Sequence, residues 1–96
     1  MYPSQALAQH REAVCATVAR FRVANPRVFG SVLHGVDRDG SDLDLLVDAL
    51  PGVTLFELGG LQEELQHLLG VPVDLLTPGE ISREFRDRVL AEARPL

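Results

Sequence analysis

The chain of 96 residues contains 46% hydrophobic and 24% charged residues, so we expect one small domain over residues 1–96 and no separate substrate-binding domain. Its net charge of −5 argues against direct nucleic-acid binding. Its nine basic residues are all arginine, which excludes chemistry that needs a lysine. Cys15 is its single cysteine, so no intramolecular disulfide can form. Its apolar runs are far shorter than the ~20 residues of a membrane-spanning helix, and its first residues do not resemble a secretion signal, so we expect a cytoplasmic protein without membrane contact.

The first predicted elements are a helix over residues 4–22 and a short strand. Apolar side chains recur at helical spacing in this range, and Ser4 is suited to cap its N-terminus. Asn25-Pro26 interrupts the pattern, so we expect the helix to end before it. Val28-Phe29 then predicts the start of a short buried strand, which leads directly into Gly30-Ser31 and a short helical turn.

A turn-rich loop, a strand and a helix follow. Residues 35–42 are rich in glycine and aspartate, which favour turns. The apolar run over residues 43–48 is typical of a strand that is covered on at least one face. Thr54 and Glu57 have the spacing of a capping box and predict the start of a helix over residues 55–69.

A third strand and a last helix complete the predicted fold. Gly70 suits the C-terminal cap of the preceding helix, and residues 71–76 predict a strand. Residues 77–80 form a second capping box, which predicts a helix with an apolar face made of Ile81, Phe85 and Val89. Residues 94–96 are expected to fray. The chain thus predicts an α/β fold of the α+β type, with a small mixed sheet of about three strands packed against helices.

Three aspartates are the candidate catalytic and metal-binding residues. Asp42 and Asp44 flank one strand residue, so their side chains point to the same face with Cα atoms about 6–7 Å apart. Carboxylates this close repel one another unless a proton or a cation lies between them, and magnesium suits such oxygen ligands. An isolated pair is also compatible with a solvated strand edge. Asp74 lies in an otherwise apolar strand, where an acid is costly unless it is paired or bound to metal.

The position of Asp74 decides between these two interpretations of the pair. If its strand lies beside that of Asp44, three carboxylates converge. Such a site can hold two metal ions about 3.5–4 Å apart, the arrangement that clamps a phosphoryl displacement.

Gly30 and Ser31 are the candidate phosphate-binding residues. A glycine directly after a strand lets the backbone approach a ligand closely. If a helical turn begins at Ser31, its free N–H groups and hydroxyl converge on one point, which suits a phosphate. Alone, the pair is equally compatible with a plain turn.

Together these segments resemble a known family. Phe29-Gly30-Ser31, a short spacer and Asp42-Leu43-Asp44 with its hydrophobic strand are similar to the signature of the polymerase-beta-like nucleotidyltransferase superfamily. The small size resembles its minimal branch, the MNT proteins. Val73-Asp74-Leu75 resembles the third acidic strand of that family. The resemblance covers roughly residues 27–76 and implies the polymerase-beta-like nucleotidyltransferase fold.

The resemblance implies a role for each of these residues. Gly30 and Ser31 would hold the phosphates of the nucleotide. Asp42 and Asp44 would be ligands shared by two magnesium ions, and Asp74 a ligand of the ion that activates the incoming hydroxyl and a candidate base. The implied reaction is attack on the α-phosphate of a nucleoside triphosphate with release of pyrophosphate.

His34 departs from the family pattern. Many minimal members have arginine before the glycine that corresponds to Gly35. Histidine is largely neutral at pH 7, so we expect lower nucleotide affinity if this position touches phosphate; otherwise His34 is a surface residue. The nearby acids Asp37, Asp39 and Asp48 are interpreted as solvated loop and strand-end residues.

The resemblance also implies an activity and a partner. Minimal members are often antitoxins paired with a HEPN-domain RNase toxin, which implies transfer of AMP from ATP to a tyrosine of that toxin. Two alternatives stay open: a binding module that neutralises its partner by contact alone, and a transferase for a small-molecule acceptor that works as an oligomer. Whether the chain forms homo- or hetero-oligomers is not decided by the sequence.

Overall fold

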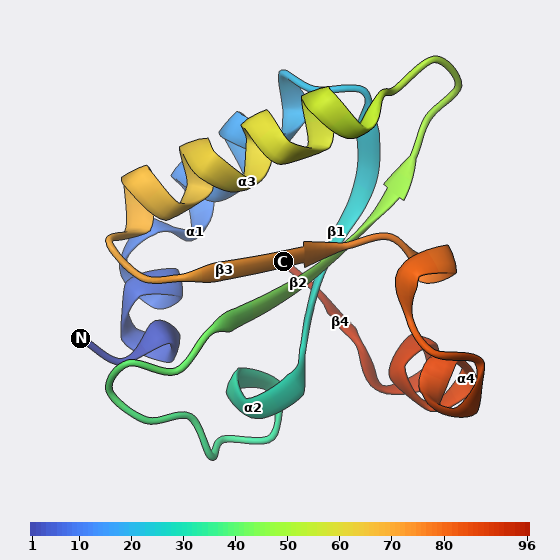
Figure 1. The fold of residues 1–96 in the computed structure, drawn as a ribbon. Coiled ribbons are helices and arrows are strands. Elements are labelled where there is room, and N and C mark those ends of the chain that lie inside the picture. The colour runs from blue at the N-terminus through green and yellow to red at the C-terminus, as the bar shows by residue number, and fades with distance from the viewer.

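The computed structural model describes residues 1–96, which form one mixed sheet with helices around it (Figure 1). The elements are, in chain order, α1 (Pro3–Ala19), β1 (Val23–Phe29), α2 (Gly30–Leu33), β2 (Leu43–Ala49), α3 (Leu55–Leu69), β3 (Val73–Leu76), the 3-10 helix η1 (Pro78–Glu80), α4 (Arg83–Glu92) and β4 (Arg94–Pro95). The sheet has the order β3-β2-β1-β4. β2 runs parallel to β3 and antiparallel to β1. The predicted fold class is therefore confirmed.

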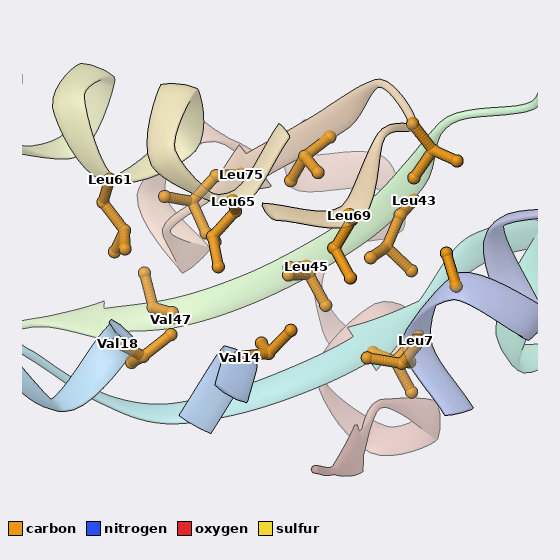
Figure 2. Close-up of a cluster of buried hydrophobic side chains, with 14 of the residues drawn as sticks. Leu7, Val14, Val18, Leu43, Leu45, Val47, Leu61, Leu65, Leu69 and Leu75 are labelled. Carbon is orange, nitrogen blue, oxygen red and sulfur yellow. The ribbon is translucent and has the colours of Figure 1, made fainter. Parts of the chain in front are cut away.

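The hydrophobic core lies on one face of this sheet, beneath α1 and α3 (Figure 2). Leu43, Leu45 and Val47 alternate along β2 and point into this core, whereas Asp44 between them faces the other side. The helices α1 and α3 contribute leucine and valine side chains to this core, and these recur at helical spacing. The fully buried members include Val14, Leu61 and Leu65. No helix of the structure has both the length and the apolar character needed to cross a membrane.

Helix α3 has the predicted local signals at both ends. The Thr54 hydroxyl accepts a hydrogen bond from the Glu57 N–H at 3.1 Å, and Gly70 adopts a left-handed conformation with φ 70° as the C-cap. These caps satisfy backbone groups that the helix itself leaves unpaired. The predicted helix over residues 55–69 is thus confirmed with its boundaries.

The predicted start of α1 is wrong by one residue, for a physical reason. Pro3 occupies the first turn, where its missing N–H costs nothing. Ser4 therefore lies inside the helix and does not cap it. The N-cap residue is Tyr2, whose side chain makes no capping hydrogen bond.

Strand β1 is longer than predicted and contains Asn25-Pro26. The register of its pairing with β2 shifts between Ala24 and Arg27, and Asn25 has a positive φ of 53°. This irregularity accommodates a proline that cannot donate to the ladder. The interruption in the sequence pattern thus marks a bulge inside the strand, not the gap between helix and strand.

The prediction that residues 94–96 fray is wrong, and these residues add a short fourth strand to the predicted sheet. Arg94–Pro95 forms β4 antiparallel to β1, and the Leu96 N–H donates to the Pro26 carbonyl at 3.1 Å. Two residues that include a proline have no strand pattern. Their conformation depends on the free edge of β1.

The last helix begins later than its capping box predicts. Thr77 and Glu80 do form the box, but it opens the short η1, and α4 starts only after Ser82. Ile81 lies between the two helices and is buried, whereas Phe85 on α4 is 44% exposed. The three residues of the predicted apolar face are therefore not packed together as one stripe.

Candidate active site

Two of the three candidate aspartates lie side by side in the sheet. Asp44 of β2 and Asp74 of β3 are register partners in the parallel pairing of these strands. Neighbouring strands are about 4.8 Å apart, and both residues lie on the face away from α1 and α3. Asp42 directly precedes β2 and lies two positions before Asp44. The structure thus pairs Asp44 with Asp74, and Asp42 lies near enough for its charge to act on Asp44.

The charges of this cluster are unbalanced. Partial burial, followed by the negative charges of Asp74 and Asp42, raises the pKa of Asp44 to about 6. Asp42 and Asp74 are exposed. A carboxyl with this pKa binds a proton at a higher pH than an ordinary aspartate unless a cation offsets the charges of its neighbours.

The residue types in this cluster fit a divalent cation. All three side chains offer carboxylate oxygens, the ligands that magnesium prefers. No three histidine, cysteine or acidic side chains form a ready-made metal cluster. Magnesium is commonly held by one or two carboxylates together with substrate phosphates and water. The donor set therefore fits a metal whose coordination the nucleotide completes.

Gly30 lies directly against this cluster. It follows Phe29, the antiparallel register partner of Asp44, and begins α2 with φ 71°. A Cβ atom at Gly30 would lie 2.9 Å from Cγ of Asp44 and closer still to Oδ2. Only glycine satisfies both the left-handed backbone and this close approach. The turn that carries Ser31 is thus packed onto the aspartates, which the sequence could not show.

His34 connects two elements beside the site. Its Nε2 lies 3.1 Å from Oε2 of Glu92, so the end of α2 is joined to the end of α4. His34, Glu92 and neighbouring residues line a groove of about 450 Å³. A larger hollow of about 880 Å³ is lined by residues of α1 and α3, such as Thr17 and His67, and contains none of the candidate site residues.

All three acids interpreted as solvated residues have defined partners, and Asp39 accepts a hydrogen bond from the N-terminal amino group at 2.6 Å. Asp48 accepts hydrogen bonds from Asn25 at 2.8 Å and from Arg27 at 2.7 Å. Asp37 accepts the Ser4 N–H at the start of α1 at 2.9 Å. Asp37 and Asp48 are partly buried, so their interpretation as solvated loop and strand-end residues is wrong. Sequence reasoning missed these contacts because the partners lie far away in the chain.

Comparison with known proteins identifies the family. The profile described as "Nucleotidyltransferase domain" matches residues 7–96. The chain belongs to the nucleotidyltransferase domain family. The resemblance noted from Gly30-Ser31 and Asp42-Leu43-Asp44 is thereby confirmed, as is the prediction of an enzyme of the nucleotidyltransferase type.

The sequences of individual relatives align with about three quarters of this nucleotidyltransferase. MJ0435 of Methanocaldococcus jannaschii, provisionally named a protein adenylyltransferase, is 38% identical over 71 residues, which are 74% of this chain and 76% of the relative. The protein adenylyltransferase MntA of Thermococcus cleftensis is 37% identical over 73 residues, 76% of this chain and 74% of the relative.

Solved structures show the same fold. One provisionally described as a minimal nucleotidyltransferase superposes with a TM-score of 0.86 at 43% identity, covering 97% of this chain and 95% of the other. A chain from a toxin–antitoxin structure with AMP-PNP superposes with a TM-score of 0.74 at 20% identity, covering 88% and 69%. At this lower identity the likeness concerns the fold alone.

Proposed function

We propose that this nucleotidyltransferase moves AMP from ATP to a tyrosine hydroxyl of a cognate HEPN RNase toxin, with magnesium as cofactor, and so acts as a cytoplasmic antitoxin. The observation that carries the proposal is the register pairing of Asp44 with Asp74, with the Gly30 turn packed against Asp44. The closeness of the Gly30 turn to Asp44 supports a site where carboxylates and backbone N–H groups act on the same nucleotide. Residues 1–96 would act as one minimal domain.

The proposed roles follow from where each residue lies. The backbone at Gly30 and the Ser31 hydroxyl bind the triphosphate. Asp42, Asp44 and Asp74 would hold two magnesium ions, which neutralise the charge that develops on the phosphates. Asp74 is exposed, so its carboxylate also receives the proton of the tyrosine hydroxyl. The tyrosine oxygen forms a bond to the α-phosphorus, the bond to the β-phosphate oxygen breaks, and pyrophosphate leaves.

A protein acceptor agrees with the shape of the site. Asp74 lies on the sheet face away from α1 and α3, and its side chain is exposed. A macromolecule can bring its own surface to such a site, whereas a small acceptor needs an enclosing pocket. The names of the relatives point the same way: MntA of Thermococcus cleftensis is a protein adenylyltransferase, and one structural neighbour is the toxin–antitoxin complex MntA–HepT.

A transfer assay with a HEPN-domain protein encoded beside this gene tests the proposal. The nucleotidyltransferase is incubated with labelled ATP, magnesium chloride and the acceptor, and the AMP adduct is located by mass spectrometry. Asp42→Asn should abolish labelling while complex formation persists. Glu63→Gln removes one exposed carboxylate from α3 and should leave labelling unchanged. Failure of the wild-type chain to label the acceptor, or transfer by Asp42→Asn at the wild-type rate, would contradict the proposal.

A second candidate function is neutralisation of the toxin by contact without catalysis. The observation that favours it is His34, which replaces the arginine of the family pattern and is paired with Glu92. Full protection from the toxin by Asp42→Asn would support this alternative. Labelling of a small molecule but not of the protein would instead support a transferase for a small acceptor.

A further inference from the structure

The loop between α2 and β2 joins the two halves of the candidate site. Residues 34–42 begin just after the Gly30-Ser31 turn and end at Asp42. Each end of the loop is closed by local hydrogen bonds. The Val36 N–H donates to the Ser31 carbonyl at 3.0 Å, and the Arg38 N–H donates to Ser41 Oγ at 2.9 Å.

Between these two turns, Asp37 ties the loop to the body of the fold. Its Oδ2 accepts the Ser4 N–H at 2.9 Å, and this hydrogen bond lowers the pKa of Asp37. The N-cap residue of α1 has no capping side chain of its own, so Asp37 supplies from a distant loop what a local cap residue normally supplies. Figure 1 shows the loop passing beside the N-terminal end of α1.

We propose that Asp37 is a positioning residue for the nucleotide site: by capping α1 it holds the loop of residues 34–42, which follows the helix of Ser31 and ends at Asp42. The sheet fixes Asp44. The position of Asp42 relative to the Gly30-Ser31 turn then depends on the loop, for which Asp37 is the part-buried contact with α1. The inference rests on the proposed nucleotide site. It concerns only residues of this chain and is independent of the acceptor.

A purely structural role for Asp37 predicts something different. If Asp37 only stabilises α1, its loss lowers thermal stability but leaves a folded site with unchanged affinity. If it positions the loop, nucleotide affinity falls even at temperatures where the variant is fully folded, and the loop amides exchange faster. A side chain that keeps the acceptor oxygen should rescue both properties.

The test uses the full chain with three variants. Asp37→Ala removes the cap, Asp37→Asn keeps an oxygen that caps almost equally well, and Asp39→Ala removes an acid from the same loop. Asp39 is the matched control because it contacts only the exposed terminal amino group of Met1. ATP affinity in magnesium chloride is measured by calorimetry, backbone exchange of residues 34–42 by hydrogen–deuterium mass spectrometry, and stability by thermal unfolding.

We expect Asp37→Ala to weaken ATP binding roughly tenfold, the scale of a small misplacement in a site, and to speed exchange in the loop. Asp37→Asn and Asp39→Ala should stay within about twofold of the wild-type affinity. A lower unfolding temperature of Asp37→Ala with unchanged affinity and exchange would overturn the inference. Absence of ATP binding by the wild-type chain would instead contradict the proposed function. The experiment therefore distinguishes failure of the role of Asp37 from failure of the proposed function.

Discussion

The two faces of the sheet differ although the same strands build both. Along β2, Leu43, Leu45 and Val47 are fully buried beneath α1 and α3, while Asp44 between them lies in a cluster of like charges on the open face. No polar or charged residue of the chain is fully buried. Asp44 thus carries a charge on the face opposite Leu43, Leu45 and Val47, although Leu46 two positions further along this same face is also fully buried. The covered face can hold the strands in place while the open face carries an electrostatically unfavourable site.

The largest effect on stability should come from the covered face. Leu45→Ala removes a fully buried side chain and should lower the free energy of unfolding by about 3 kcal/mol. Leu90→Ala on α4, where the leucine is 38% exposed, should change it by less than about 0.5 kcal/mol. Urea denaturation measures both. Equal effects would contradict the conclusion that burial beneath α1 and α3 provides most of the stability.

Gly30→Ala should break the contact between the turn and the open face. The new Cβ collides with Asp44 and the left-handed backbone disfavours alanine, so we expect a loss of about 2 kcal/mol in stability and loss of ATP binding. Gly35→Ala is the matched control, because Gly35 has the same φ of 71° but no atom within 4 Å of the added Cβ. The difference in stability and ATP binding between the two variants measures the effect of the contact between residue 30 and Asp44. Equal stability and equal ATP binding would contradict the role given to Gly30.

Asp44→Asn removes one negative charge from the open face and leaves the covered face unchanged. Magnesium should raise the ATP affinity of the wild-type chain about tenfold, since the cation offsets the repulsion between carboxylates and phosphates. In Asp44→Asn this magnesium effect should disappear. Calorimetry with and without magnesium chloride measures it. A wild-type affinity that does not depend on the metal would count against the two-ion site.

The smallest expected effect is a pH dependence of stability. The pKa of Asp44 is raised to about 6 in the folded state, above its ordinary value near 3.9. Between these values the folded state binds more protons than the unfolded state, so stability falls as pH rises from about 4 to about 6. Solvent screening keeps the effect small because Asp44 is only partly buried. The difference in unfolding free energy between the wild-type chain and Asp44→Asn, measured without metal, should change between about pH 4 and pH 6. A difference that does not depend on pH would contradict the raised pKa of Asp44.

Local signals in the sequence were sufficient for much of the fold. The caps at Thr54 and Gly70 act within one or two turns of a helix, so a few neighbouring residues specify them. The period of a strand also predicts that Asp44 lies on the face opposite Leu43 and Leu45, as it does in the structure. The capping box at residues 77–80 was also correct locally, yet it could not tell a 3-10 turn from the start of α4.

The sequence by itself determined which residues alternate between the two faces and where the helix caps lie, because these features depend on short periods and nearby backbone groups. Only the tertiary structure decided that Asp74 is the register partner of Asp44, that Asp37 caps α1, and that Arg94–Pro95 extends the sheet. Each of these contacts joins segments far apart in the chain. A single hydrogen bond or a two-residue strand leaves no periodic pattern, so only the folded backbone fixes the partner.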